Sequence, residues 1–460
     1  MKKLFFILQC VFAFCVVNAQ TWSALGSGLG STSPDWVEGM AIYNGNLYAG
    51  GNFNTAGSIT VNNIARWNGI TWDSVGNGFI NVPLYSLYVY KNELYVGGDS
   101  PWGQGIVRWN DTVWKSVGGG VSGFPATVSA LSEYNNELYA GGEFNSAGGV
   151  PANLIARWNG SLWDSVDAGI YGANVHAMAV YSNELYVAGG FDSAGHIAAK
   201  NIAKWNGTNW SAVGNGTSAW NDKILDLTVY NNELYAVGSF SIAAGIPARG
   251  IVKWNGSSWS SLNNVNNTGM YFFALTVYNN ELYAGGYFDT LFVSSAPKSI
   301  NSIARWNASS WDSVGSGINY NNVSGSVWGL LNDTINNTLY VGGTFNNAGG
   351  LSAINIARWS TPSGISENTK TNNINIYPNP MNSHVSFLFS TQKKSNNVQL
   401  AFYDLYGKEV SSNIKVNLIS QTQQKTEVNV INVSLKNGVY IYKVYSDNEL
   451  IGTGKIIVIN

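Results

Sequence analysis

Residues 175–191 read VHAMAVYSNELYVAGGF, and residues 201–214 read NIAKWNGTNWSAVG. In the first stretch, two apolar runs flank Ser182-Asn183, a pair typical of a tight turn between antiparallel strands. Gly189-Gly190 ends the second run, and Asn206-Gly207 separates two further short apolar runs. Neither stretch has the spacing of apolar residues that marks a helix. The whole segment therefore predicts four consecutive antiparallel strands.

This four-strand pattern recurs seven times along the chain. Each copy has an apolar strand ending in Tyr, a turn, a Leu-Tyr strand running into Gly-Gly, a strand ending in Trp, and a strand beginning with Trp. The Leu-Tyr step falls at Tyr48, Tyr95, Tyr139, Tyr186, Tyr235, Tyr283 and Tyr340, with spacings of 44 to 57 residues. A period of this length with four strands per copy is typical of a β-propeller blade.

Tryptophan residues indicate how the ring closes. The third strands end at Trp67, Trp109, Trp158, Trp205, Trp254, Trp306 and Trp359, and the fourth strands begin at Trp22, Trp72, Trp114, Trp163, Trp210, Trp259 and Trp311. The last third strand has no fourth strand after it, whereas Thr21–Gly26 is a fourth strand with no third strand before it. We predict an all-β fold in which the N-terminal strand completes a seven-bladed β-propeller and removes its free edges.

The repeat resembles a known family. Gly-Gly after an apolar strand, an aromatic residue in the third strand and Trp at the start of the fourth are similar to the kelch repeat. The sequence of the repeats also resembles that of a fungal cortical polarity-marker family. Both resemblances imply a propeller fold and leave its function open, because propellers carry many activities.

The N-terminus is typical of a secretory signal peptide. Lys2 and Lys3 precede an apolar run, and Val17-Asn18-Ala19 supplies small residues for cleavage. We expect residues 1–19 to be removed on export. Both cysteines of the chain lie in this segment, so we expect neither disulfides nor thiol chemistry in the mature protein.

The C-terminal segment differs in composition from the repeats. Residues 361–373 read as a polar linker, and several short alternating strands in 374–460 predict a small β-sandwich. Three motifs resemble the type A sorting domain of the type IX secretion system: Ile376 to Pro380, Phe402 to Lys408, and Leu435 to Tyr440, with Lys455 near the end. The resemblance assigns the sorting signal to Tyr377, Pro378, Asn379, Pro380, Asp404, Gly407, Gly438, Tyr440 and Lys455. It implies a secreted or outer-membrane surface protein that engages the type IX machinery.

Composition and charge exclude several classes of function. The net charge is −2 and only 11% of residues are charged, which argues against nucleic-acid binding. No segment beyond the signal is long and apolar enough to predict a membrane span. Only three histidines occur, and no pair has metal-ligand spacing. We therefore expect no metal, no cofactor and no catalytic residue set, and a protein that acts as a monomer.

A candidate binding site lies where the repeat varies. The position five residues before the Tyr that ends the first strand differs in every copy: Glu38, Tyr85, Ser129, His176, Leu225, Phe273 and, by alignment, Trp328. Four tryptophans lie outside the repeated pairs: Trp36, Trp102, Trp220 and Trp328. We predict that Trp36, Glu38, Tyr85, Trp102, His176, Trp220, Phe273 and Trp328 form a ligand site at one face of the propeller.

Three functions remain open from the sequence. The first is a non-enzymatic binding or adhesion module for a glycan or a protein, since exposed aromatic residues stack on sugar rings and anchor protein partners. The second is a secreted carbohydrate-active enzyme at the channel mouth, for which Glu38, Asp226 and Asp35 are the available acids. The third is a structural surface protein without a discrete pocket.

Overall fold

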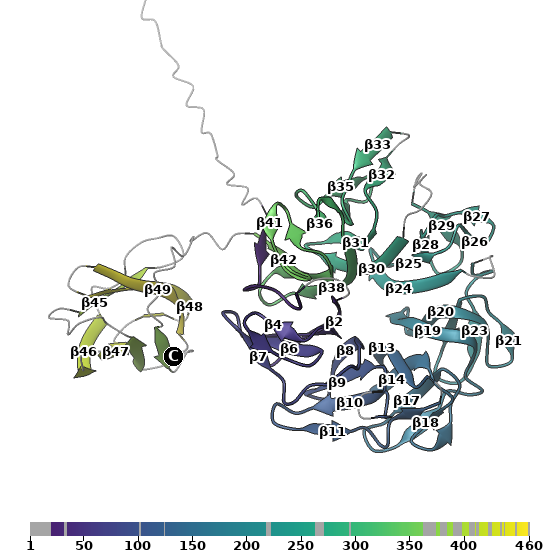
Figure 1. Cartoon of the computed structure of the whole chain (residues 1–460), viewed down its shortest axis with the longest axis horizontal. Helices are drawn as coiled ribbons and strands as arrows, with labels where there is room; N and C mark the ends of the chain where they lie inside the picture. The colour runs from purple at the N-terminus through teal and green to yellow at the C-terminus, as the bar shows by residue number, and fades with distance from the viewer. Residues whose placement is uncertain are drawn as a thin grey trace, which may run out of the picture. The chain divides into compact units, whose positions relative to one another are not determined.

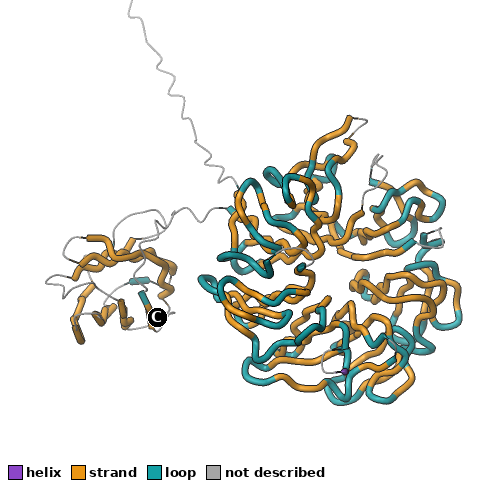
Figure 2. Tube along the Cα trace, viewed as in Figure 1, coloured by secondary structure: helices purple, strands orange, loops and turns teal. Residues whose placement is uncertain are grey.

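The computed structural model describes residues 20–31, 35–100, 103–123, 125–217, 222–262, 271–293, 296–361 and shorter stretches between 374 and 458. Within these residues the secondary structure is antiparallel β-sheet, without α-helix (Figure 2). Contacts divide the chain into two compact units, Met1–Thr361 and Pro362–Asn460. The predicted signal peptide, residues 1–19, and most of the predicted linker lie outside the described residues.

The first unit contains, in its described residues, seven sheets that share one strand order. The first strands are β2 (Trp36–Tyr43), β8 (Leu84–Tyr90), β13 (Thr127–Tyr134), β19 (Ile170–Tyr181), β24 (Lys223–Tyr230), β30 (Tyr271–Tyr278) and β38 (Ser326–Asp333). The second strands are β3 (Asn46–Asn52), β9 (Glu93–Gly98), β14 (Glu137–Glu143), β20 (Glu184–Ala194), β25 (Glu233–Ser239), β31 (Glu281–Tyr287) and β39 (Thr338–Thr344).

The two outer strands of each sheet are shorter. The third strands are β6 (Ile64–Trp67), β10 (Ile106–Trp109), β17 (Ile155–Trp158), β22 (Ile202–Trp205), β28 (Ile251–Trp254), β34 (Ile303–Trp306) and β42 (Ile356–Ser360). The fourth strands are β7 (Trp72–Ser74), β11 (Trp114–Ser116), β18 (Trp163–Ser165), β23 (Trp210–Ala212), β29 (Trp259–Ser261), β35 (Trp311–Ser313) and, from the N-terminus, β1 (Thr21–Ala24).

Small strands occupy the connections between the main ones. They are β4 (Thr55–Ala56), β5 (Ile59–Thr60), β12 (Val121–Ser122), β15 (Ser146–Ala147), β16 (Val150–Pro151), β21 (Ile197–Ala198), β26 (Ile242–Ala243), β27 (Ile246–Pro247), β32 (Thr290–Val293), β33 (Ala296–Ser299), β36 (Ile318–Tyr320), β37 (Val323–Ser324), β40 (Asn347–Ala348) and β41 (Leu351–Ser352). Most of them form short hairpins that follow the second strand of a sheet.

The N-terminal strand pairs as the sequence predicts. β1 runs antiparallel to β42, with Trp22 opposite Trp359, and the sheet continues to β39 and β38. The two indoles lie with ring centroids 5.2 Å apart, and the equivalent Trp pair recurs in the other six sheets at 4.9 to 5.4 Å. A strand from one end of the chain therefore completes a sheet built at the other end.

The first strands of the seven sheets contact one another in order, and the last contacts the first. β2 packs against β8, β8 against β13, and so on through β19, β24, β30 and β38, which packs against β2. Figure 1 shows the sheets around a common centre, with these first strands innermost. The apolar core lies between neighbouring sheets, as in the cluster of Tyr134, Ile155, Val187 and Trp205.

Hydrogen bonds repeat at the boundaries between sheets. The Tyr that ends a first strand donates to a carbonyl in the turn of the next sheet, as Tyr90 does to Asn136 at 2.7 Å. The same bond joins Tyr43 to Asn92, Tyr134 to Asn183, Tyr181 to Asn232, and Tyr278 to Asn337. The residues that recur in the repeat thus form both the apolar core and the hydrogen bonds that join one sheet to the next.

The second unit is formed of two antiparallel sheets. One is β43 (Asn375–Tyr377), β44 (His384–Phe389), β47 (Thr426–Asn432) and β46 (Ile414–Gln421), and the other is β45 (Val398–Tyr403), β48 (Gly438–Ser446) and β49 (Glu449–Val458). Phe387 of the first sheet packs edge-on against Phe402 and Tyr442 of the second. Both sheets thus share one core, as expected of a small β-sandwich.

Candidate functional site

Every one of the seven sheets has a β-bulge at the same place in its first strand. The register between first and second strands skips Tyr85, Ser129, His176, Leu225, Phe273 or Trp328, and in the first sheet it skips Glu38 with Gly39. A bulge leaves one residue unpaired and re-aims its side chain. The skipped residues include all seven that occupy the variable position identified in the sequence.

A glycine lies across from each bulge, and in five of the seven sheets it is the second glycine of the Gly-Gly step. A Cβ atom on the second glycine would meet the first strand's backbone, at 2.0 Å from the carbonyl oxygen of Trp36 for Gly51 and of Thr127 for Gly142. Only glycine tolerates this approach, and a glycine inside a strand commonly marks a bulge. The most regular feature of the repeat thus makes room for its most variable one.

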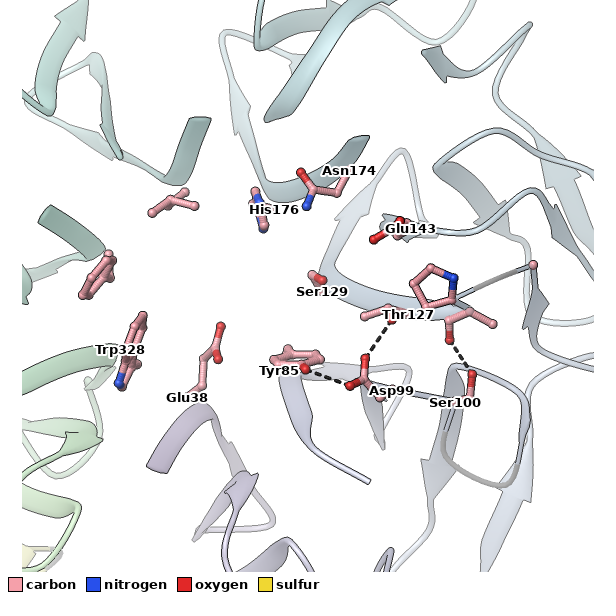
Figure 3. A pocket seen from close by; sticks show the side chains of 15 residues that line it. Glu38, Tyr85, Asp99, Ser100, Thr127, Ser129, Glu143, Asn174, His176 and Trp328 are labelled. Carbon is pink, nitrogen blue, oxygen red and sulfur yellow. Dashed lines mark hydrogen bonds between the residues drawn. The ribbon is translucent and has the colours of Figure 1, made fainter. Parts of the chain in front are cut away.

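All seven bulge residues line one cavity of about 760 Å³ (Figure 3). The rest of its lining comes from the polar residues Asp99, Ser100, Thr127, Glu143 and Asn174 and from Gly123, Pro125 and Ala126. A volume of this size lies within the range of small-molecule sites, which span about 300–1,000 Å³. The bulges therefore bring seven different side chains from seven sheets into one concave site.

One wall of the cavity is aromatic. The ring of Phe273 stacks on Trp328 at a centroid distance of 4.1 Å and an interplanar angle of 15°. Tyr271, near the start of the same strand as Phe273, lies parallel to it at 6.3 Å and is 45% exposed. The Trp328 indole nitrogen donates to Thr344 Oγ1 at 3.2 Å, which orients the indole. Leu225 extends this apolar wall.

The opposite wall carries hydrogen-bonding groups held in defined positions. The carboxylate of Asp99 accepts bonds from the Tyr85 hydroxyl at 2.9 Å and from Thr127 Oγ1 at 2.8 Å (Figure 3). Ser100 Oγ donates to the carbonyl of Ala126 at 2.8 Å. Burial, followed by the neighbouring Asp99 carboxylate, raises the pKa of Tyr85 far above its usual value, so its hydroxyl stays protonated.

Glu38 lies between these two walls. Its backbone packs against the seventh sheet, because a Cβ on Gly329 would lie 2.1 Å from the Glu38 carbonyl oxygen. Within the described residues its carboxyl group makes no hydrogen bond or salt bridge, and burial raises its pKa from 4.5 to about 8. A carboxylic acid in this setting holds its proton at neutral pH and can donate a hydrogen bond.

His176 and Asn174 present polar atoms without partners on a third side. His176 Nε2 and Asn174 Oδ1 are both buried and have no hydrogen-bond partner among the described residues. Burial, with a smaller effect of the Lys223 charge, lowers the pKa of His176 to about 4, so the imidazole is neutral at neutral pH. Buried polar atoms are seldom left unsatisfied, and a ligand is one way to satisfy them.

The structure brings together five of the eight ligand-site residues predicted from sequence, because Glu38, Tyr85, His176, Phe273 and Trp328 all line the cavity. Trp36 is the first residue of β2, pairs with Asn52 and is not part of the cavity lining. Trp102 and Trp220 lie outside the described residues.

Of the three acids proposed for an enzymatic site, Glu38 lines the cavity and the other two do not. Asp35 accepts a bond from the backbone nitrogen of Ser31 at 3.0 Å, and it does not line the cavity. Asp226 accepts two backbone N–H bonds, from Leu227 at 2.7 Å and from Leu275 in the next sheet at 2.6 Å. Burial raises the Asp226 pKa to about 7, and its role is to join two sheets.

Sequence reasoning missed the acids that do line the cavity, Asp99 and Glu143. Both occupy the third position of the Gly-Gly-x-Phe segment, which reads Asn52, Asp99, Glu143, Gly190, Ser239, Tyr287 and Thr344 around the seven sheets. This position varies as strongly as the bulge position does. Its variability was the available signal, and the bulge explains why its side chain reaches the same space.

The described residues show neither a metal site nor a membrane-spanning helix, and they include part of the sorting signal. They contain no cluster of three or more His, Cys, Asp or Glu able to hold a metal ion, and no helix with the length and hydropathy needed to cross a membrane. Tyr377 ends β43, Gly438 and Tyr440 lie in β48, and Lys455 lies in β49. Pro378, Asn379, Pro380, Asp404 and Gly407 fall outside the described residues.

Comparison with protein families identifies the second unit. Residues 375–459 match the family of secretion system C-terminal sorting domains, which confirms the predicted type IX sorting domain. This domain implies that the chain is cargo of the type IX machinery and is exported to the outer-membrane surface or the medium. No curated protein matches the chain.

Two solved structures are similar to the chain at low sequence identity. One is a structural genomics protein of unknown function from Bacteroides thetaiotaomicron, with 11% identity, a TM-score of 0.35, and coverage of 74% of this chain and 76% of that one. The other is YjhT, with 15% identity, a TM-score of 0.33, and coverage of 71% of this chain and 95% of that one. At these scores neither similarity supports a conclusion about this chain.

Proposed function

We propose that the seven sheets are the blades of a kelch-like β-propeller, completed by the N-terminal strand, and that this propeller is a non-enzymatic glycan-binding module. We assign it residues 20–360 and the sorting domain residues 374–460. The shared strand order and the contacts of each first strand with the next, from β38 back to β2, support the propeller. The sorting domain supports a site of action outside the cell.

One observation carries the binding proposal: the seven bulge residues are all different, and all seven line the same cavity. A position with a purely structural role keeps the same residue type in every copy of a repeat, as the seven Trp pairs illustrate. Seven unlike side chains at a position that faces a cavity are instead what an asymmetric ligand requires, because each side chain contacts a different part of the ligand.

The chemistry of the walls favours a carbohydrate over a protein surface. Sugar rings have apolar faces that pack on aromatic side chains and hydroxyl groups that need hydrogen-bond partners. The stack of Phe273 and Trp328 supplies the first, and Asp99, Asn174 and His176 supply the second. A concave cavity of about 760 Å³ suits a short oligosaccharide or the end of a chain, whereas a protein partner needs a broader contact surface.

A carbohydrate-active enzyme is the second candidate, favoured by one observation. Glu38 holds its proton at neutral pH, as a general acid does. A glycosidase also needs a second carboxylate that is free to act as base or nucleophile. Asp99 is bound by Tyr85 and Thr127, so the second role would fall to Glu143. The two candidates therefore differ in the role of Glu143, whose carboxylate a glycosidase needs for turnover and a binding module does not.

The test is retention of the chain beginning at Gln20 on insoluble polysaccharides and soluble glycans, with product analysis of the same samples. We expect retention without new reducing ends. Trp328→Ala should abolish it, and Trp36→Ala should not, since Trp36 is a first-strand Trp outside the cavity. Released sugars would establish the enzyme instead, and a lack of retention on every glycan would contradict the proposal in favour of a protein ligand or a structural role.

A further inference from the structure

The charged side chains that line the cavity are all acidic. Glu38, Asp99 and Glu143 contribute to the lining, and no Lys or Arg does so among the described residues. Lys223 lies near His176 and Gly190 without entering the lining. The cavity thus offers carboxyl groups and neutral hydrogen-bonding groups to a ligand, and no cationic group to balance them.

The glutamates that recur in the repeat differ from Glu38 in this respect. The glutamates that recur in the hairpins of the sheets have basic partners, such as Glu93 with Arg108 at 2.6 Å and Glu184 with Lys204 at 2.7 Å. The same holds for Glu233 with Lys253 at 2.8 Å. Glu38 has no such partner in the described residues, and it lines the cavity with its side chain only partly buried. A carboxyl group that faces a cavity without a basic partner can take its counter-charge from a ligand.

The neighbours of Glu38 define what could balance it. On one side is Trp328 of the seventh sheet, and on the other is Tyr85 of the second (Figure 3). After burial and the Asp99 carboxylate, the charge of Glu38 makes a small contribution to the raised pKa of the Tyr85 hydroxyl. Aromatic faces attract cations, Trp most strongly, and a carboxylate beside them strengthens the attraction. A site of this composition is suited to an ammonium group.

We infer that the glycan recognised in this cavity carries a free amino group, which binds as an ammonium ion at Glu38 between Trp328 and Tyr85. This inference rests on the proposed function and specifies the ligand as an amino sugar. The sugar ring would pack on the aromatic wall of Phe273 and Trp328. Its hydroxyl groups would form hydrogen bonds with the unpartnered polar atoms on the third side, His176 Nε2 and Asn174 Oδ1.

Binding of an ammonium group should displace a proton. Free Glu38 is protonated at neutral pH, and an adjacent cation favours its ionised form, so one proton leaves the carboxyl as the ammonium arrives. The other titratable groups facing the site are Tyr85, Asp99, Glu143 and His176, with Lys223 behind them. Tyr85 stays protonated and His176 neutral at this pH, so neither of them supplies the released proton.

The experiment is calorimetric titration of the full mature chain at pH 6.5 with three trisaccharides of matched size. They are the trimer of glucosamine, the trimer of N-acetylglucosamine and cellotriose. We expect the glucosamine trimer to bind at least tenfold more tightly than the other two, with proton release measured by repeating the titration in buffers of different ionisation enthalpy. Glu38→Gln should remove both the preference and the proton release, and Glu93→Gln, at a salt-bridged glutamate outside the cavity, should remove neither.

Two results would overturn the inference in distinguishable ways. Equal binding of all three sugars, unchanged by Glu38→Gln, would contradict the ammonium site and leave glycan binding intact. Binding of a lysine-containing peptide in place of every sugar would contradict glycan binding itself. The substitution is nearly isosteric, and circular dichroism of the variant would establish that a lost preference does not arise from a lost fold.

Discussion

The indole nitrogen of Trp22 donates a hydrogen bond of 3.0 Å to the carbonyl oxygen of Val314, 292 residues further along the chain. The same bond joins the fourth strand to the preceding sheet in five more of the seven sheets: Trp72 to Leu25, Trp114 to Val75, Trp163 to Val117, Trp210 to Val166, and Trp259 to Val213. In the sixth sheet the indole nitrogen of Trp311 has no hydrogen-bond partner among the described residues. Trp22 therefore makes the hydrogen bond that is typical of a fourth strand, although it lies at the N-terminal end of the described residues.

We expect Trp22→Ala to destabilise the first unit strongly. Trp22 is 6% exposed and packs on Trp359, so its removal leaves a large cavity where the N-terminal strand meets the last sheet. Loss of a buried Trp costs about 3–5 kcal/mol in the free energy of unfolding. Deletion of Thr21–Gly26 should be more severe. Urea denaturation followed by Trp fluorescence measures both effects.

The control for this prediction is Ile70→Ala, at a turn residue that is 78% exposed. This change should alter the free energy of unfolding by less than about 0.5 kcal/mol. Unfolding of the deletion variant at the parent's urea concentration would show that the N-terminal strand is dispensable, and completion of the seventh blade by that strand would have to be abandoned.

The four-strand repeat could be predicted because its residues act locally. Ser182-Asn183 and Asn206-Gly207 form turns by their own conformational preferences, and each Trp pair lies on adjacent strands of one sheet. The predicted third strand, Ile202–Trp205, agrees with the structure, whereas the first strand begins at Ile170 and not at Val175. Strand ends depend on pairing with residues far along the chain, which local patterns do not contain.

The candidate site could be predicted only in part, for a related reason. Variation at the bulge position pointed to Glu38, His176 and Trp328, but only the register of the sheets reveals that these side chains face one cavity. Asp99 and Glu143 were missed because they lie at the ends of second strands, Glu143 as the last residue of β14 and Asp99 directly after β9. How close such a residue comes to the centre depends on the bulge across from it.

Gly329→Ala should disturb the site through its backbone. The added Cβ would lie 2.1 Å from the Glu38 carbonyl oxygen, so either Glu38 or its neighbour Trp328 must move. Overpacking of this kind costs about 1–3 kcal/mol. The matched control is Gly39→Ala, whose Cβ would approach the flexible end of Leu87 at 2.9 Å and should be milder. Thermal unfolding that ranks the two variants in the opposite order would contradict the packing described here.

The stability of the first unit should fall as pH rises from 4.5 to about 8. Burial raises the pKa of Glu38 across this window, so the folded chain keeps a proton that the unfolded chain releases. Because the unfolded state then binds fewer protons, the free energy of unfolding decreases with pH until the folded carboxyl also ionises. Asp226, whose pKa is raised to about 7, adds to the same trend.

Glu38→Gln should reduce this pH dependence. The difference in the free energy of unfolding, variant minus parent, should therefore be larger at pH 8 than at pH 4.5. Solvent in the cavity screens the charge, so we expect a difference on the order of 1–3 kcal/mol. Urea denaturation at several pH values measures it. Ser129→Ala, at an uncharged bulge residue, is the control and should keep the parent's slope. Parallel pH profiles for the parent and Glu38→Gln would indicate that Glu38 is well solvated.

Export should depend on the second unit and not on the cavity. Residues 375–459 match the sorting-domain family, so a chain truncated before Ile374 should cross the inner membrane and then accumulate in the periplasm. The Trp328→Ala variant carries an intact sorting domain and should reach the cell surface or the medium in the parent's amount. Cell fractionation and immunoblotting of the two variants measure this separation. Because the two changes lie in different compact units, equal export of the truncated chain would mean that recognition by the secretion machinery extends into the first unit.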